Sequence, residues 1–116
     1  MRHSGHFLNL NGGIYAIVNR LSQRTYIGQV TVFNMRLNNH RSQLRMGKHR
    51  NKELQRDWRE FGESAFEFRV LFSSPSWVID ETGTAMLTEL EKLYLRGVES
   101  NTYNIATPVN TRLAIR

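Results

Sequence analysis

The first regular pattern in the chain is a pair of short runs rich in β-branched and aromatic side chains. The runs cover residues 13–18 and 25–30, and the polar residues 19–23 between them are typical of a turn. This arrangement predicts two antiparallel strands joined as a hairpin. Tyr15 and Tyr26 would then lie on neighbouring strands.

Two segments with helical character follow the hairpin, and each ends at a glycine. Residues 34–46 contain no run of strand-forming residues and stop at Gly47, a residue typical of a helix C-cap. The next segment begins near Asn51, a candidate N-cap, and continues to Phe61, just before Gly62. The apolar face of this second helix is formed by Leu54, Trp58 and Phe61.

Two further segments complete the pattern. Residues 66–72 alternate between apolar and polar side chains, which predicts a third strand with one buried face. After a loop at 73–76, a helix is expected to begin at Trp77 or Thr84 and to end at Leu95. The side chains expected in the core are Phe66, Phe68, Val70 and Phe72 of the strand and Met86, Leu87, Leu90, Leu93 and Tyr94 of the helix.

The order strand–strand–helix–helix–strand–helix predicts an α+β fold, a small antiparallel sheet covered by helices. The 116 residues include six Phe, four Tyr and two Trp, enough for one core, while the length is too short for two. We expect residues 1–11 to be a polar lead-in and residues 12–116 to form the domain. The chain has no cysteine, which excludes disulfides and thiolate sites. No apolar run is long enough to cross a membrane.

Charge is distributed unevenly along the chain. Lys and Arg outnumber Asp and Glu by 16 to 10, but residues 1–52 contain nine of the cations and no acid at all. The first part of the chain therefore cannot neutralise its own cations. This pattern favours a polyanionic partner, with nucleic acid ahead of a membrane surface, although a solvated basic surface stays open as an alternative.

Arginine and histidine side chains at helical spacing form the first candidate site. Arg36 and His40 are four residues apart and would project from one face of the helix. Arg41 and Arg45 repeat this spacing. No acidic residue lies among them, so a surface facing phosphate groups is favoured over a merely solvated face. His49 follows the end of the helix closely enough to return toward the same site.

One acidic residue of the second part of the chain is in an unusual setting. Glu91 has apolar neighbours three and four residues away on its helix, and a partly buried acid is costly unless it pairs with a cation or a metal. From spacing alone, a salt bridge to an arginine is favoured, and Glu89 at the margin of the apolar stripe stays open as well. The acids expected to face solvent are Glu53, Asp57, Glu60 and Glu63.

Short motifs spread along the chain resemble those of the GIY-YIG nuclease family. They are Gly13-Ile14-Tyr15, Tyr26-Ile27-Gly28, Phe33 with Arg36 and His40, the run Gly47–Gln55, Phe61-Gly62 with Phe66 and Phe68, Leu87 with Glu91, and Tyr103-Asn104-Ile105-Ala106. Each tripeptide alone is a weak signal, whereas their order and spacing over residues 12–107 are specific. The resemblance is closest to the catalytic domains of phage and intron homing endonucleases.

The resemblance implies a three-stranded antiparallel sheet flanked by helices and metal-dependent hydrolysis of a DNA phosphodiester bond. It also implies that Glu91 is the metal-binding glutamate, which decides between it and Glu89. The residues that match the family's site are Tyr15, Tyr26, Arg36, His40, Glu91 and Asn104. Further residues expected to contact DNA are Arg24, Arg41, Arg45, Lys48, His49, Arg50 and Lys52, of which His49 matches a histidine of the homing branch.

The chemistry expected from these residues is a one-metal hydrolysis. Glu91 would hold one divalent cation, which we expect to be Mg²⁺ with Mn²⁺ as the alternative. Arg36 would replace a second cation on the phosphate. Tyr15 would be the base for the attacking water, although a phenol with a pKa of about 10 needs help from nearby positive charge or proton acceptance by His40. Tyr26 would hydrogen-bond the phosphate or the water.

Three features depart from the family pattern: the lead-in before the first motif, Arg24 in place of a common lysine, and no sequence after Arg116 for a separate DNA-binding domain. We expect DNA as the partner, no membrane, and an intracellular, cytoplasmic location in the setting of a phage or mobile element. Target recognition would need an absent DNA-binding domain, a protein partner or a transient dimer. A non-cleaving nucleic-acid-binding module and a repair or restriction nuclease stay open as alternatives.

Overall fold

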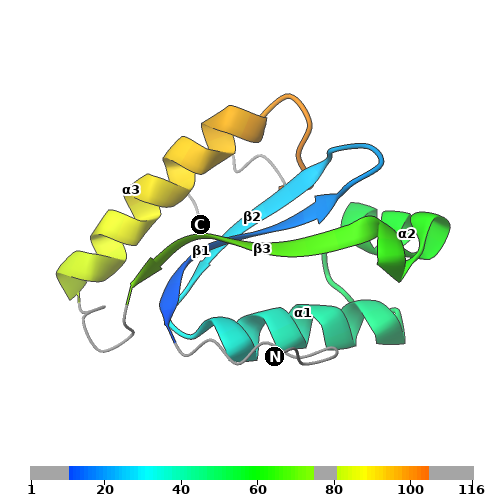
Figure 1. The fold of residues 1–116 in the computed structure, drawn as a ribbon, viewed down its shortest axis with the longest axis horizontal. Coiled ribbons are helices and arrows are strands. Elements are labelled where there is room, and N and C mark those ends of the chain that lie inside the picture. Colours follow the sequence, from blue (N-terminus) through cyan, green and yellow to red (C-terminus); the bar gives the residue numbers. More distant parts are fainter. Residues whose placement is uncertain (1–10, 75–80, 105–116) are drawn as a thin grey trace.

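The structure, a computed structural model, describes residues 11–74 and 81–104 of the chain (Figure 1). The elements follow the predicted order, with a short 3-10 turn added before the third strand. Most of the predicted lead-in, the alternative helix start at Trp77 and the residues after Asn104 lie outside the described residues. The elements are β1 Gly12–Asn19, β2 Thr25–Val30, α1 Phe33–Met46, α2 Lys52–Phe61, η1 Glu63–Ala65, β3 Phe66–Ser74 and α3 Glu81–Val98.

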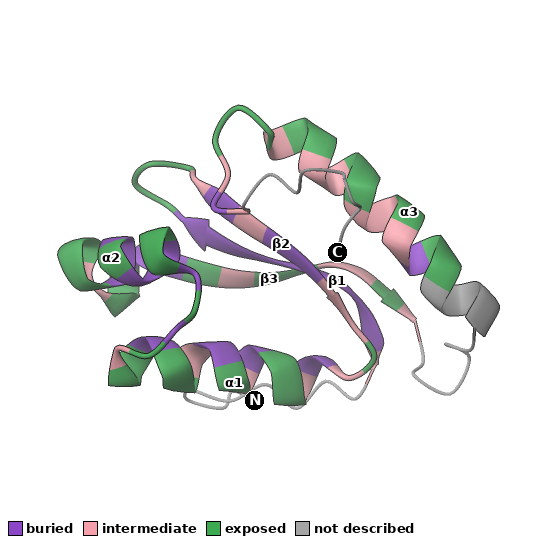
Figure 2. Ribbon diagram, turned by 180° about the vertical axis from the view of Figure 1, so that it is seen from behind, coloured by how far each residue is buried: buried purple, intermediate pink, exposed green. Residues whose placement is uncertain are grey.

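The three strands form one antiparallel sheet in the order β2-β1-β3, so β1 is the central strand. All eight residues of β1 are buried, as the purple strand in Figure 2 shows. The reason is that α3 covers one face of the sheet while α1 and α2 cover the other (Figure 1). The predicted α+β fold with a three-stranded antiparallel sheet is confirmed.

Side-chain alternation along β1 creates two separate cores, one on each face of the sheet. Tyr15 and Ile17 face the layer of α1 and α2, and the residues on either side of them face α3. The first core contains Tyr15, Ile17, Phe33, Leu37, Leu44, Leu54, Trp58, Ala65, Phe66 and Tyr103, and the second contains Ile14, Ala16, Val18, Ile27 and Leu87. Tyr15 therefore lies on the side of the sheet that also carries His40.

Both predicted helix ends at the connection between α1 and α2 are confirmed. Gly47 has a φ of 74°, a left-handed conformation that glycine adopts without strain, and its N–H turns back to carbonyls in the last turn of α1. Asn51 caps α2, because its side chain accepts a hydrogen bond of 3.0 Å from the N–H of Leu54. The connection is thus held at both ends, and it carries His49.

The prediction of one regularly buried face on the third strand is wrong for its second half. The register between β1 and β3 shifts between Ile14 and Tyr15, which marks a bulge in β3. As a result, Leu71 and Phe72 both pack against the second core, whereas Val70 is 38% exposed. A bulge puts neighbouring residues on the same face, and simple alternation does not reveal it.

Some residues of the predicted apolar faces are exposed. Met86 and Leu93 of α3 are 56% and 57% exposed, and Phe61 at the end of α2 is 37% exposed. Figure 2 shows α3 mostly in the colours of intermediate and exposed residues, because it contacts the sheet along one narrow stripe. Within the described part of the chain, no helix combines the length and apolarity needed to cross a membrane.

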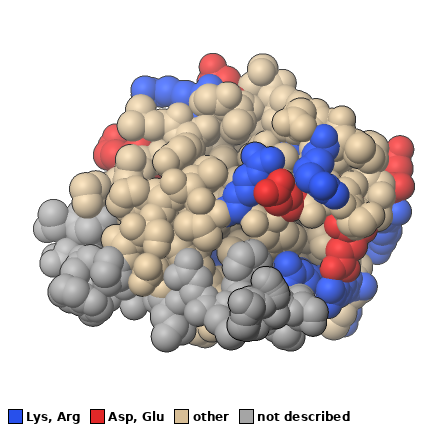
Figure 3. Space-filling model, in the orientation of Figure 1, with Lys and Arg blue, Asp and Glu red and all other residues tan. Residues whose placement is uncertain are grey.

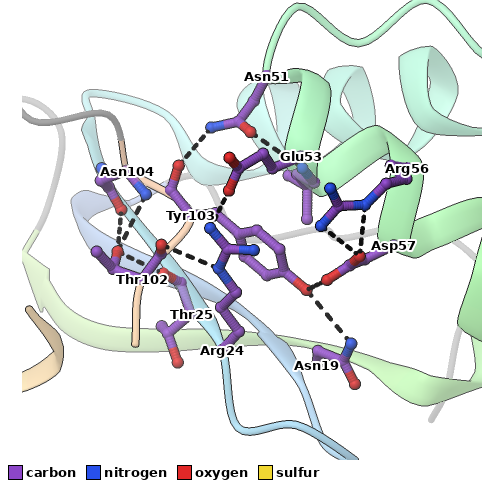
Figure 4. Close-up of polar contacts among 11 residues, drawn as sticks. Asn19, Arg24, Thr25, Asn51, Glu53, Arg56, Asp57, Thr102, Tyr103 and Asn104 are labelled. Carbon is purple, nitrogen blue, oxygen red and sulfur yellow. Dashed lines mark hydrogen bonds and ion pairs between the residues drawn. The ribbon is translucent and has the colours of Figure 1, made fainter. Parts of the chain in front are cut away.

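Asp57 contradicts the expectation that the acids of the second helix face solvent. Its side chain is buried and accepts a hydrogen bond of 2.7 Å from the hydroxyl of Tyr103 (Figure 4). The same carboxylate pairs with Arg56, and the Tyr103 hydroxyl also accepts a hydrogen bond from Asn19. This network ties α2 to the segment that carries Asn104, and helical spacing alone contains no sign of it.

Candidate active site

A cavity of about 450 Å³ lies between α1, β2, the α1–α2 connection and the segment after α3. Two arginines and no acidic residue line it, which is a composition suited to an anion. Four of the six residues predicted for the site, and two of those expected to contact DNA, lie on its wall. The lining residues are Tyr26, Arg36, His40, Gln43, His49, Arg50, Asn51 and Asn104.

A line of short hydrogen bonds leads from this cavity wall into the core. The hydroxyl of Tyr15 lies 2.7 Å from Nε2 of His40, and Nδ1 of His40 lies 2.7 Å from Nε2 of His49. At the far end, Nδ1 of His49 accepts a hydrogen bond of 3.0 Å from the backbone N–H of Asn51. All three side chains are buried. The structure thus brings Tyr15 and His40 together and adds His49 to them.

Tyr26 lies beside this line and faces the cavity. Its ring centroid is 6.3 Å from that of Tyr15 and 5.3 Å from that of His40, the latter in an edge-on arrangement that aromatic rings favour. The two predicted tyrosines therefore differ in access. Tyr26 is half-buried on the cavity wall, whereas Tyr15 is enclosed behind it with 1% of its surface exposed.

The glycines of the two tripeptide motifs make room for their neighbours. Gly28 is directly opposite Tyr15 in the β1–β2 pair, and a Cβ atom at position 28 would overlap the Tyr15 ring and hydroxyl. Gly13 has a φ of 149°, and a Cβ there would overlap the carbonyl of Phe72. The position of the Tyr15 ring therefore requires glycine at position 28.

Replacing Gly28 with alanine is expected to destabilise the protein by about 1–3 kcal/mol, because the Tyr15 ring must move in a packed core. Urea unfolding measures the change. Gly97→Ala is the matched control: Gly97 lies on α3 with open space around the new methyl group, so stability should rise by about 1 kcal/mol. An unchanged free energy of unfolding in Gly28→Ala would show that the ring has room to move.

The environment holds both tyrosines in their protonated form. Burial is the main cause that raises the pKa of Tyr15 and of Tyr26, and Glu91 raises both further, while Arg36 lowers both. Arg50 also lowers the pKa of Tyr26.

The buried histidines predict a stability that depends on pH. The pKa of His40 is lowered from 6.5 to about 3, mainly by burial, and His49, Arg36 and Arg50 act in the same direction. The pKa of His49 is also lowered, mainly by burial. Between pH 6.5 and 3 the unfolded chain therefore binds more protons than the folded protein, and the free energy of unfolding should fall as the pH decreases.

Urea unfolding between about pH 7 and about pH 5 checks this prediction above the range in which carboxylates titrate. His40→Gln is the control, because glutamine does not titrate. The fall in stability should be smaller in this variant than in the unchanged protein. Equal falls in both proteins would show that His40 is not held uncharged by the fold.

Glu91 is partly buried on α3 and lies close enough to both predicted tyrosines to raise their pKa values. Its Oε1 accepts a hydrogen bond of 3.1 Å from Nε2 of Gln29, which also donates to Thr88. The side chain of Glu89, by contrast, is 72% exposed and pairs with Lys92. Of the two acids that spacing left open, Glu91 is the one near the predicted tyrosines, although it does not line the cavity.

Asn104 anchors the segment after α3 to strand β2. Its Oδ1 accepts a hydrogen bond of 2.8 Å from the N–H of Ile27, and its Nδ2 donates one of 2.9 Å to the carbonyl of the same residue. The hydroxyl of Thr102 donates to the same Oδ1, as Figure 4 shows. Because Ile27 directly follows Tyr26, Asn104 holds the strand that presents this tyrosine to the cavity.

Four uncharged polar side chains that build the site were absent from the predicted set. Gln43 and Asn51 line the cavity, and Gln29 holds Glu91. Gln55 accepts a hydrogen bond of 2.9 Å from the backbone of the α1–α2 connection. A Gln or Asn in a sequence does not by itself indicate a functional site. The only signal available was position, since Gln29 comes directly after the second tripeptide motif and Asn51 was expected as a cap.

Among residues 11–52, which the structure describes, some of the cations are paired with acids from later in the chain. Arg24 pairs with Glu53, and Arg45 pairs with Glu63 at 2.6 Å. Figure 3 shows blue Lys and Arg side chains beside red Asp and Glu side chains on the face in view. Acids that are distant in the sequence thus neutralise cations that lack local partners.

The other residues expected to contact DNA lie in different settings. Arg50 joins the wall of the cavity, Lys48 is exposed on the same connection, and Lys52 is exposed at the first position of α2. Arg41 lies over the ring of Phe68, with 4.7 Å between its guanidinium carbon and the ring centroid. Of these cations expected to contact DNA, Arg50 is the one that lines the cavity.

The chain is similar in sequence and in fold to known proteins. A family model described as the GIY-YIG catalytic domain matches residues 11–104. The structure of the catalytic domain of homing endonuclease I-TevI is similar, with 30% identity and a TM-score of 0.71 over 83% of this chain and 99% of that one. A point mutant of the catalytic domain of intron endonuclease I-TevI gives 30% identity and a TM-score of 0.69, over 83% and 94%. No curated protein matches the chain.

Proposed function

This chain belongs to the GIY-YIG catalytic domain family, and on that premise we propose that it is a metal-dependent endonuclease that hydrolyses a phosphodiester bond of DNA. The observation that carries the proposal is the meeting of Tyr26, Arg36 and His40 on one cavity. Tyr15 is hydrogen-bonded directly behind them. We assign this activity to residues 12–116.

Arg36 is the proposed phosphate-binding residue. It is exposed, lies on the cavity wall and comes from a helix that packs against the sheet. Its guanidinium group is therefore positioned by the helix and accessible to a phosphate group. A guanidinium group matches two phosphate oxygens at once and stabilises the charge that develops on them. Arg50 on the same wall, with Lys48 and Lys52 beside it, would hold the neighbouring DNA backbone.

The two phenols are the proposed groups that activate the attacking water. Tyr26 lines the cavity and would contact the water or the phosphate, while Tyr15 would be the base. Burial raises the pKa of both, so loss of a proton requires positive charge nearby. Arg36 supplies part of it, because its charge lowers the pKa of both tyrosines.

Glu91 is the proposed ligand of the metal ion. Its carboxylate is oriented by Gln29 and offers the oxygen ligands that Mg²⁺ prefers, with Mn²⁺ as the alternative. Among the described residues, no group of three or more His, Asp or Glu side chains is placed to hold a metal ion. When bound, such an ion neutralises charge on phosphate oxygens and lowers the pKa of bound water. We propose a single ion, with Arg36 in place of a second.

Incubation with supercoiled plasmid DNA and Mg²⁺ tests the proposed function. Nicked or linear product should form, and EDTA should stop the reaction. A gel-shift assay on the same DNA distinguishes the alternative. Retained binding without cleavage in either Mg²⁺ or Mn²⁺ would replace the proposed nuclease with a non-cleaving DNA-binding module on the same fold.

The biological setting is proposed from the similarity to homing endonuclease domains. We propose action on DNA inside the cell, with target recognition aided by a further DNA-binding domain or a protein partner. One site cuts one strand at a time, so a double-strand break would need a transient dimer or two successive nicks. Sequencing cut ends from a mixed DNA library separates a homing-type or restriction-type target, which has a defined sequence, from a repair-type target, which has a defined structure.

A further inference from the structure

A series of hydrogen bonds links Asn51 to Tyr15. The main-chain N–H at its start determines which atom donates in each of them. We propose that the backbone N–H of Asn51, acting through His49, fixes His40 as a hydrogen-bond donor to the Tyr15 oxygen. His40 then stabilises the Tyr15 oxygen and does not take its proton. This inference rests on the proposed function for its catalytic meaning, and on the contacts between the rings for its geometry.

The direction begins at the N-cap of α2. A backbone N–H can only donate, so the hydrogen bond of 3.0 Å from Asn51 requires a lone pair on Nδ1 of His49. A neutral imidazole carries one hydrogen, on one of its two nitrogens. His49 must therefore carry its hydrogen on Nε2, which is the atom that faces His40.

The same reasoning applies to the ring of His40, which contacts that of His49. Nε2–H of His49 donates to Nδ1 of His40 over 2.7 Å, so the hydrogen of His40 is on Nε2. That atom lies 2.7 Å from the Tyr15 hydroxyl and donates to its oxygen. If the hydrogen bonds ran in the opposite direction, or if His40 carried a hydrogen on both ring nitrogens, two hydrogens would face each other at one of these contacts. The arrangement thus opposes proton transfer from Tyr15 to His40.

Tyr15 must then direct its own proton elsewhere. The neighbouring phenol is that of Tyr26, whose ring centroid lies 6.3 Å from that of Tyr15. We assign the departing proton to the Tyr26 oxygen, while Tyr26 releases its own proton to a solvent water in the cavity that it lines, which leaves Tyr15 as the phenolate. The sequence leaves the final proton acceptor open, with His40 as one alternative, and the contacts between the rings oppose that alternative.

Side-chain contacts around the α1–α2 connection hold the Asn51 end of this line in place. The Asn51 side chain accepts from the N–H of Leu54 and donates to the carbonyl of Tyr103 at 2.8 Å (Figure 4). Gln55 accepts from the backbone N–H of His49 at 2.9 Å. Because these contacts prevent the backbone at position 51 from turning away, Asn51 and His49 are positioning residues for His40.

Long-range ¹H–¹⁵N correlation spectra of the ¹⁵N-labelled full chain test the proposal at neutral pH, without DNA or metal. Both His40 and His49 should show the coupling pattern of a ring protonated on Nε2 alone. The signals are assigned by single His→Gln substitutions. Protonation of either ring on Nδ1 would overturn the inference whether or not the protein cleaves DNA. If the spectra show the expected pattern but the protein does not cleave DNA, the proposed function is overturned and the inference about the histidines stands.

Two variants of His49 test its positioning role. Glutamine can present an N–H near the place of Nε2, so His49→Gln should keep His40 protonated on Nε2 and retain most of the cleavage rate. His49→Leu removes the donor, so both nitrogens of His40 should share the hydrogen and cleavage should fall about 10- to 100-fold. A His49→Leu protein with an unchanged His40 spectrum would overturn the inference. If that variant fails to fold, the spectrum of the unchanged protein decides.

Discussion

Replacing Glu91 with glutamine is expected to reduce DNA cleavage about a thousand-fold, because a metal ion on the phosphate contributes several kcal/mol and a neutral amide does not hold it. Glutamine has nearly the shape of glutamate and keeps an oxygen to accept the hydrogen bond from Gln29. The fold should therefore remain intact by circular dichroism. Initial rates of plasmid nicking over a series of Mg²⁺ concentrations measure the effect.

Glu89→Gln is the matched control for this experiment. Glu89 lies two residues earlier on the same helix, but its side chain is 72% exposed and pairs with Lys92. The same chemical change there should leave the cleavage rate within about twofold, since exposed ion pairs contribute little. Cleavage by Glu91→Gln at the rate of the Glu89→Gln protein would remove Glu91 from the proposed metal site.

The second large effect is expected for Arg36→Ala, which should reduce cleavage by about 10²- to 10⁴-fold. The guanidinium group is proposed to stabilise charge on the phosphate in the transition state. There a single hydrogen-bond donor raises the rate by a factor of about 10²–10³, and an arginine raises it by a larger factor. Because Arg36 is exposed, its removal should change the free energy of unfolding by less than about 0.5 kcal/mol. Nicking assays and urea unfolding measure the two effects.

Two controls separate the roles of Arg36. Arg36→Lys keeps the positive charge without the planar fork, so it should recover only part of the cleavage rate. Arg69→Ala removes an exposed arginine that pairs with Glu67 on β3, and should cut at the normal rate. If Arg36→Lys cleaved as fast as the unchanged protein, charge alone would be sufficient and the proposed two-oxygen contact would be wrong.

The fold was largely predictable because its elements depend on neighbouring residues. The ends of α1 and α2 follow from Gly47 and Asn51, whose capping contacts span about one turn. The prediction failed at the second half of β3, where a bulge beside Tyr15 places Leu71 and Phe72 on one face. That bulge arises from pairing with β1, a contact that local alternation does not contain.

The candidate site was predictable to the extent that its residues belong to motifs. Spacing alone placed Arg36 and His40 on one side of α1, and both line the cavity. Spacing did not distinguish Glu91 from Glu89, and resemblance to a family was needed to choose between them. The tertiary structure supports the choice independently, since only Glu91 contacts Gln29 and influences the tyrosines.

By itself the sequence determined which helices and strands form and which motif residues are candidates for the chemistry, because both depend on residue types at short, regular spacing. Only the tertiary structure decided that Asp57 is buried, that Arg24 pairs with Glu53, and that hydrogen bonds run from Asn51 to Tyr15. Each of these features rests on contacts between separate elements. They exist because the helices pack on a sheet with β1 at its centre, and no rule of sequence spacing describes that packing.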